Sequence, residues 1–291
     1  MGCRVCVVFS HPSPETPTWP YKGYDYEARK EAIKSSLREA LPGLDLVFRT
    51  AMSPGDAERV VKEVGDVDGY VVFMLGIWVG VGYAIARTGK PTVLVDDIYG
   101  GSGELILTYA RVRSEGLPVL PVASSRFEDV VKAMRLIEVI SSIRRSKIIV
   151  VTDRDVSKPA EAIKESLGIE VLKVSPDKLN RYYREASLEE AEKWADKWIS
   201  EALRVVEPSR DEIVKAGRMY LAMKRLLMEE NASAITVDCL NLVYSGRLEA
   251  YPCLGFFQLN NEGFIGACEA DLNSTAAMLI IKHLTGEPSF I

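Results

Sequence analysis

"YVVFMLGIWVGVGYAIARTGKPTVLVDD", residues 70–97, passes from one apolar run through a glycine-rich segment and a helical pattern into a second apolar run. "YVVFML" (70–75) and "TVLVD" (92–96) have the length and β-branched content of strands that are buried on both faces. "GIWVGVG" (76–82) follows the first run and opens the helix. This arrangement predicts two parallel strands joined by a helical crossover.

The same alternation continues on both sides of this stretch. The other predicted strands of the first half are "VCVVF" (5–9), "LDLVF" (44–48) and "LPVLPV" (117–122), and helices are predicted over 26–41 and 127–145. From Lys147 the pattern restarts, with predicted strands at 147–153, 169–175, 234–240, 253–259 and 264–268. Helices predicted over 187–206 and 209–231 both begin with a Ser followed three residues later by Glu, which resembles a capping box. We therefore predict an α/β protein of two consecutive Rossmann-like (flavodoxin-like) domains with mainly parallel sheets, at 1–146 and 147–291.

Composition and charge narrow the classes of function. The chain is 47% hydrophobic and 26% charged, as expected of a globular protein, and its 36 basic and 41 acidic residues give a net charge of −5. No basic stripe is evident, so nucleic acid is not an expected partner.

The first apolar run is too short for a signal peptide or a membrane span, so no membrane partner is expected either. Five cysteines, an odd number, favour free thiols and a cytoplasmic location. Gln258 is the only glutamine, which points to a heat-adapted source.

Two features of the first domain fall where open α/β sheets bind ligands, at the carboxyl edge of the strands. His11 directly follows the first strand. "DDIYGGSGE" (96–104) follows the fourth strand, and its Gly101, Ser102 and Gly103 suit a mobile substrate loop or, equally, a plain connection. "GIWVGVG" could cradle an anion with its backbone, but it lacks the full dinucleotide and P-loop patterns and is better interpreted as a close strand-to-helix turn.

Glu269 and Asp271 are the most informative acidic residues. They stand two apart in "ACEADLNSTAAMLIIKHLTG" (267–286), where a predicted buried strand passes into an apolar helix. Residues two apart on a strand point to the same face, so both carboxylates are expected to converge. Asp271 near a helix start has an alternative role as a helix cap. A buried Glu269 needs a cation, or else its pKa rises and it becomes a proton-transfer group.

The segments "AITVDCL" (234–240) and "CLGFFQLNNEGFIGACEADLNSTAAMLIIKHLTGEPSF" (253–290) resemble the central region of the L-fucose isomerase and L-arabinose isomerase superfamily. In that family an E-x-D segment precedes a buried helix that ends in L-T-G-x-P. The resemblance covers residues 146–291 in detail and the first domain only at the level of the fold.

The resemblance implies aldose–ketose isomerisation through an enediol with Mn²⁺ as Lewis acid. It implies that Glu269 is a metal ligand and the proton-transferring residue, and that Asp271 supports a ligand or caps the helix. The family's later ligands and its C-terminal domain have no counterpart in these 291 residues. We therefore expect an incomplete metal site, with a companion chain as one source of the missing domain. The resemblance also implies a homo-oligomer.

Two functions remain open at the level of sequence. The first is a sugar isomerase, or part of one, that acts on a small-molecule sugar. The alternative is a non-catalytic protein that binds a sugar or polyol as a sensor or regulatory subunit.

Overall fold

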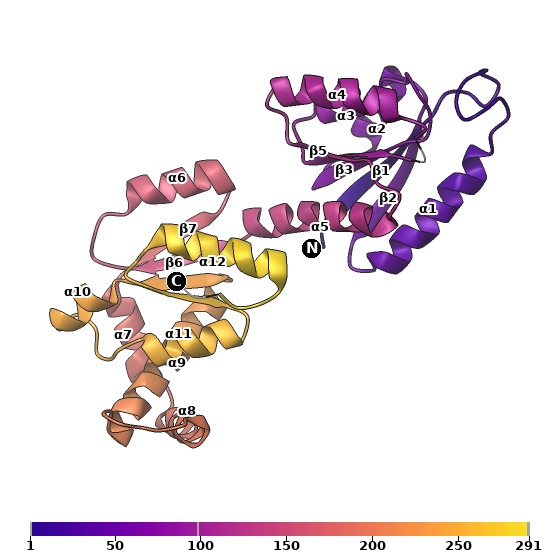
Figure 1. Cartoon of the computed structure of the whole chain (residues 1–291). Helices are drawn as coiled ribbons and strands as arrows, with labels where there is room; N and C mark the ends of the chain where they lie inside the picture. The colour runs from indigo at the N-terminus through magenta and orange to yellow at the C-terminus, as the bar shows by residue number, and fades with distance from the viewer. Residues whose placement is uncertain (1, 98, 290–291) are drawn as a thin grey trace. The chain divides into compact units, whose positions relative to one another are not determined.

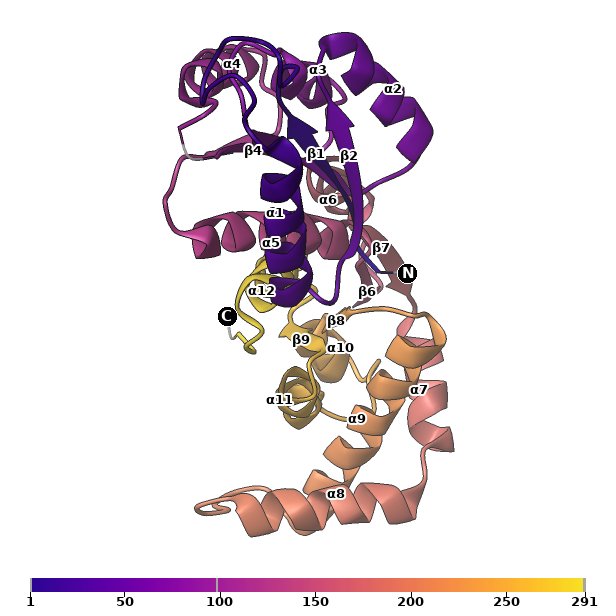
Figure 2. The same ribbon diagram turned by 90° about the vertical axis from the view of Figure 1, so that its right-hand side faces the viewer.

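The structure, a computed structural model, describes residues 2–97 and 99–289. It divides into two compact units, Met1–Ser141 and Ser142–Ile291, and the division falls inside helix α5 (Phe127–Arg144). Each unit is an α/β layer structure with one parallel sheet (Figures 1 and 2). The predicted fold class is confirmed. Among the described residues, no helix has both the length and the hydropathy needed to cross a bilayer.

Unit 1 has a five-stranded sheet of order β2-β1-β3-β4-β5, in which every pairing is parallel. The strands are β1 (Arg4–Ser10), β2 (Asp45–Ala51), β3 (Gly69–Met74), β4 (Thr92–Asp96) and β5 (Val119–Val122). They match the five strands predicted for the first half. The central strands β1, β3 and β4 are buried runs rich in β-branched residues, as is usual for parallel strands covered on both faces. The helices that connect successive strands are α1 (Tyr26–Ala40), α2 (Pro54–Val64), α3 (Val81–Ala86) and α4 (Ser102–Ser114), and α5 follows β5.

The two faces of the unit 1 sheet carry separate cores. Alternate residues of β1 point to opposite faces, so Val7 packs with α1 and α5, whereas Val8 packs with α2 and α3. On the first face, Ile33 and Leu37 of α1 are fully buried. This alternation is the physical basis of the layered fold, since each helix buries one apolar stripe against the sheet.

Unit 2 has a four-stranded parallel sheet of order β7-β6-β8-β9. The strands are β6 (Lys147–Val151), β7 (Glu170–Val174), β8 (Ala234–Val237) and β9 (Ile265–Cys268). The helices are α6 (Ser157–Leu167), α7 (Pro176–Glu185), α8 (Leu188–Glu201), α9 (Arg210–Glu229), α10 (Cys239–Tyr244), α11 (Cys253–Asn261) and α12 (Leu272–Thr285). The predicted capping serines are confirmed: Ser187 and Ser209 accept the N–H groups of Glu190 and Glu212.

One predicted strand of unit 2 is wrong. Residues 253–259 are the first two turns of α11, which packs against α9 and β9. Gly255 permits this packing, because a Cβ there would lie 2.3 Å from the Met223 side chain. A short apolar run carries no clear period, so tertiary contacts decide between strand and helix.

Candidate functional site

Ligands of open α/β sheets bind at the carboxyl edges of the strands, so the candidate sites of both units are expected there. The strand order reverses between β1 and β3 in unit 1 and between β6 and β8 in unit 2. Side chains that follow these strands, together with those after β4 and β9, make up the candidate sites.

Glu269 and Asp271 do not form a buried pair of carboxylates. Both residues are exposed, and Glu269 and Ala270 form a turn with φ values of 64° and 53° after β9 has ended. The prediction of two buried carboxylates on one strand face is therefore wrong, because the strand stops at Cys268. Glu269 accepts a hydrogen bond from the Cys239 thiol at 3.3 Å.

Asp271 is the N-cap residue of α12. Its carboxylate accepts the backbone N–H groups of Asn273 and Ser274, each at 3.0 Å, and the Ser274 hydroxyl. These hydrogen bonds, that of the Ser274 side chain foremost, hold the pKa of Asp271 below its ordinary value. The Asp271 carboxylate thus forms its hydrogen bonds with the first turn of its own helix.

The surroundings of Glu269 do not fit the manganese ion that the family resemblance implies. Manganese needs several hard oxygen or imidazole ligands. Across residues 2–97 and 99–289, no three His, Cys, Asp or Glu side chains gather in a way that could hold a metal ion. The described residues therefore do not provide a ligand set for such an ion, and the catalytic role of Glu269 stays a prediction.

His11 lies at the carboxyl end of β1 and is buried. Its Nδ1–H donates to the Pro12 carbonyl oxygen at 2.8 Å, and its ring stacks on Tyr26 with the ring centres 4.2 Å apart. Burial lowers the pKa of His11, so the neutral form is favoured. Within the described residues, neither its Nε2 nor the Ser10 hydroxyl has a hydrogen-bond partner.

The glycine-rich loop after β4 is tied to the sheet. The buried carboxylate of Asp96 accepts the Gly101 N–H at 3.0 Å and the Ser102 hydroxyl. Gly101 itself approaches Met74 so closely that a Cβ there would lie 2.3 Å from the Met74 Cβ. Gly101 precedes α4, and Ser102 and Gly103 are its first residues; residue 98 of the predicted loop lies outside the described residues.

A cavity of about 250 Å³, the β4–β5 pocket, opens beside this loop at the carboxyl edge of β4 and β5. Its polar wall is an ion pair in which Arg29 of α1 donates two hydrogen bonds to Asp97, from Nε at 2.8 Å and from Nη2 at 2.6 Å. Asp96, Ser124 and Ser125 add further oxygen atoms, and the rings of Phe73, Tyr99 and Phe127 add apolar surface. The Asp97 side chain is only 10% exposed, so this pair is largely shielded from water.

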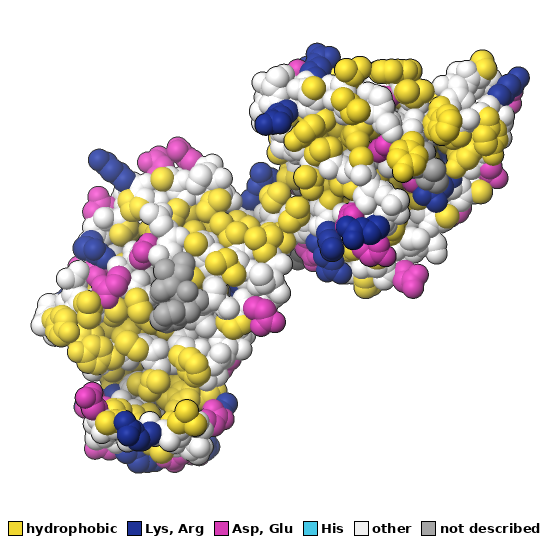
Figure 3. All heavy atoms as spheres, viewed as in Figure 1, with side chains coloured by type: hydrophobic (Ala, Val, Ile, Leu, Met, Phe, Trp, Pro, Cys, Tyr) yellow, Lys and Arg dark blue, Asp and Glu magenta, His cyan; other side chains and the backbone are white. Residues whose placement is uncertain are grey.

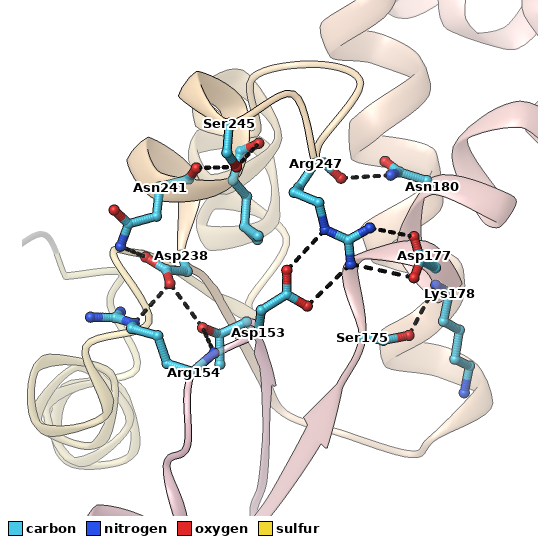
Figure 4. A network of polar contacts seen from close by, with 12 residues as sticks. Asp153, Arg154, Ser175, Asp177, Lys178, Asn180, Asp238, Asn241, Ser245 and Arg247 are labelled. Atoms are coloured by element: carbon cyan, nitrogen blue, oxygen red, sulfur yellow. Dashed lines mark hydrogen bonds and ion pairs between the residues drawn. The ribbon is translucent and has the colours of Figure 1, made fainter.

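At the carboxyl edge of unit 2, charged side chains bond to one another (Figure 4). The Arg247 guanidinium bridges Asp153 and Asp177, with its closest contact 2.9 Å from Nε to Asp153. These hydrogen bonds lower the pKa of Asp153. The network therefore links the loop after β6, the first turn of α7 and the loop after α10.

Asp238 is the buried member of this edge. It accepts hydrogen bonds from Thr152 Oγ1 at 2.8 Å and Asn241 Nδ2 at 2.9 Å, and Arg154 Nε lies 2.8 Å away. A buried carboxylate with three partners is satisfied, which indicates a structural role.

The sequence analysis included Asp97 in the candidate loop 96–104 without giving it a role of its own, and it missed Arg29, Asp238 and Arg247. Asp97 and Asp238 stand directly after buried apolar runs, which is a usable signal for the carboxyl edge. Arg29 and Arg247 carry no such signal, because their partners are distant in the sequence.

Comparisons with known proteins assign no family. No family model matches the chain, and no curated protein matches it. One solved structure that it resembles is a periplasmic solute-binding protein of an ABC transporter from Actinobacillus succinogenes with bound D-allose, at 11% identity, covering 99% of this chain and 93% of that one, with a TM-score of 0.25. Another is the XylFII–LytSN complex, at 15% identity, covering 100% and 96%, with a TM-score of 0.23. TM-scores this low carry no argument about function.

Two expectations are corrected by these comparisons. The resemblance to L-fucose and L-arabinose isomerases, with its isomerase and manganese chemistry, is withdrawn, because no family model and no curated protein matches the chain and the described residues gather no set of metal ligands. The cytoplasmic location is withdrawn as well, because cysteine usage and the length of the first apolar run do not fix a compartment; the first of the two solved structures is of a periplasmic protein. The match does not assign this chain to another compartment.

Proposed function

We propose that the chain binds a sugar or another small polyol without transforming it, as a sensor or regulatory protein would. The observation that carries this proposal is the β4–β5 pocket, which is lined by both the Arg29–Asp97 ion pair and aromatic rings.

The chemistry of the wall suits a polyol. Sugar hydroxyl groups both donate and accept hydrogen bonds, a carboxylate accepts several, and a guanidinium donates up to five. Charge-assisted hydrogen bonds of this kind are stronger than neutral ones. The Asp97 and Arg29 side chains can therefore bind neighbouring hydroxyls, while Tyr99 and Phe127 contact the C–H face of the ring.

The size of the pocket agrees with such a ligand. Pockets for drug-sized molecules run from about 300 to 1,000 Å³. At about 250 Å³ the β4–β5 pocket is slightly smaller, which favours a molecule the size of a single sugar ring or a short polyol.

The test is calorimetric titration with a panel of aldoses, ketoses and linear polyols against the wild type, Asp97→Asn and Asp196→Asn. Asp196 is a matched control, because Arg210 also donates two hydrogen bonds to it, at 3.0 and 3.1 Å, on the surface of unit 2. We expect at least one sugar to bind the wild type and Asp196→Asn equally, and Asp97→Asn at least about tenfold more weakly. The proposal is rejected if no member of the panel binds, or if Asp97→Asn binds like the wild type.

A further inference from the structure

A second and larger cavity lies in the helical layer of unit 1, between α2, α3 and α4. We call it the α2–α4 groove; its volume is about 780 Å³. It exists because α3, with six residues, is much shorter than the helices on both sides of it, α2 and α4, and cannot fill the layer between them (Figures 1 and 2). Figure 3 shows hydrophobic side chains gathered on the part of unit 1 that α4 covers, where Ile106 and Leu107 are exposed.

One wall of the α2–α4 groove is an aromatic ring held in an unusual conformation. Trp78 has a φ of 62° and a side chain that is 64% exposed, and it lines the groove. A bulky residue in the left-handed region costs on the order of 1–3 kcal/mol and persists only where its surroundings enforce it. Because Trp78 is exposed, burial of its side chain does not account for this strained backbone conformation.

The conformation of Trp78 is enforced by Glu104. The buried Glu104 carboxylate accepts the backbone N–H groups of Val79 at 2.6 Å and Gly80 at 2.7 Å. The end of the indole ring lies over Gly103, where a Cβ would be 3.5 Å from Cζ2. Glu104 therefore takes the backbone N–H groups that "GIWVGVG" could have offered to an anion. By fixing this backbone, it holds the Trp78 ring in place at the groove.

Cations outnumber free carboxylates along the α2–α4 groove. Lys62 and Arg87 are exposed, and neither side chain forms a hydrogen bond or an ion pair with another described residue. The Arg111 guanidinium stacks on the Tyr83 ring at 3.7 Å and pairs with Glu115 at 3.1 Å. Of the two acids that line the groove, Glu104 is bound to backbone N–H groups, which leaves Glu58.

We propose that the α2–α4 groove binds a small organic anion with a flat apolar body, such as an aromatic carboxylate or sulfonate. Trp78 and Leu107 provide the apolar contact for the flat body, and Lys62 and Arg87 provide the charge that complements the anionic group. The groove volume lies within the range of pockets for single organic molecules, which favours a small ligand over a macromolecule. This site is separate from the β4–β5 pocket and does not depend on sugar binding.

Two fluorescent probes with the same aromatic frame test the proposal. Anilinonaphthalene sulfonate carries the anionic group, and N-phenylnaphthylamine lacks it. In titrations of the intact chain we expect the sulfonate to bind at one saturable site and at least about tenfold more tightly than the neutral probe. Equal binding of the two probes would contradict the role of the cations.

Variants locate the bound probe. Trp78→Ala and the double variant Lys62→Gln/Arg87→Gln should each weaken sulfonate binding about tenfold. Arg113→Gln is the matched control, because Arg113 is an exposed arginine of α4 that does not line the groove, and it should bind like the wild type. All four residues are exposed, and circular dichroism checks that the variants fold. If sulfonate binding is unchanged in both groove variants, the proposal is wrong.

Discussion

Arg29 and Asp97, which are 68 residues apart in the sequence, form a doubly hydrogen-bonded ion pair at the carboxyl edge of the unit 1 sheet. Arg29 belongs to α1 and Asp97 directly follows β4, so the pair links a crossover helix to the loop that borders the β4–β5 pocket. The pair is largely shielded from water, with side-chain exposures of 30% and 10%.

Asp97→Asn should lower the free energy of unfolding by about 1–3 kcal/mol, because it removes a charge-assisted pair and leaves Arg29 without its carboxylate. The Arg210–Asp196 pair is more exposed, so Asp196→Asn should cost less than about 1 kcal/mol. Urea denaturation of the three proteins measures both values. Equal losses in the two variants would show that the Arg29–Asp97 pair contributes no more than a surface pair.

Gly101→Ala should destabilise unit 1 by about 1–3 kcal/mol, because the new Cβ would overlap Met74 of β3 and force the loop away. Gly103→Ala is the control two residues on. Its Cβ would lie 3.4 Å from the nearest atom, and alanine favours the helix by about 0.5–1 kcal/mol. Thermal denaturation should show a lower Tm for the first variant only, and a normal Tm for Gly101→Ala would contradict the close approach to Met74.

Asp271→Ala should cost about 1 kcal/mol, since it removes the N-cap of α12. Glu269→Gln should change the free energy of unfolding by less than about 0.5 kcal/mol, because the side chain is exposed and bonded only to a thiol among the described residues. Denaturant titrations of the two variants measure both changes in the free energy of unfolding. A loss for Glu269→Gln as large as that for Asp271→Ala would indicate a structural role that the contacts do not explain.

Stability should decrease as the pH falls below about 6.5. Burial lowers the pKa of His11 and of His283 in the folded chain below the ordinary value of 6.5. The unfolded chain therefore binds more protons than the folded one between the folded pKa values and about 6.5, so the stabilisation is complete above that pH and is lost below it. His11→Asn and His283→Asn should each flatten the dependence of the Tm on pH between about 5 and 7. An unchanged slope in both variants would rule out this origin.

The cysteines should differ widely in reactivity. Burial raises the pKa of Cys6 to about 11 and that of Cys239 to about 12, so both remain protonated thiols near neutral pH. Cys253 is exposed at the start of α11. Iodoacetamide at pH 8 should alkylate Cys253 first and reach Cys6 and Cys239 only in denaturant, as mass spectrometry of the digested protein would show. Early labelling of Cys239 would indicate that the α10 region opens in the native state.

The strand and helix alternation was predictable because its signals are local. Buried β-branched runs such as residues 70–75 and serine caps such as Ser187 act within a few residues, so a linear pattern reports them. Residues 253–259 form the exception, since an apolar run of seven residues satisfies a strand and a helix equally well. Contact with α9 resolved that choice.

The candidate sites were less predictable because they depend on which strand ends meet. Asp97 could be placed at a carboxyl edge from its position after an apolar run, but its partner Arg29 could not. Glu269 was expected to be buried from its apolar neighbours, yet the end of β9 at Cys268 turns it into solvent. A strand end is set by pairing with β8, which the residues of β9 alone do not determine.

By itself, the sequence determined that the chain forms parallel α/β sheets with helices on both faces, because hydrophobic periodicity and helix capping are properties of neighbouring residues. Only the tertiary structure decided that Arg29 pairs with Asp97, that Glu104 accepts the backbone N–H groups of Val79 and Gly80, and that α3 leaves a groove between α2 and α4. The physical reason is that these contacts arise from strand order and helix length in three dimensions, which join residues far apart along the chain.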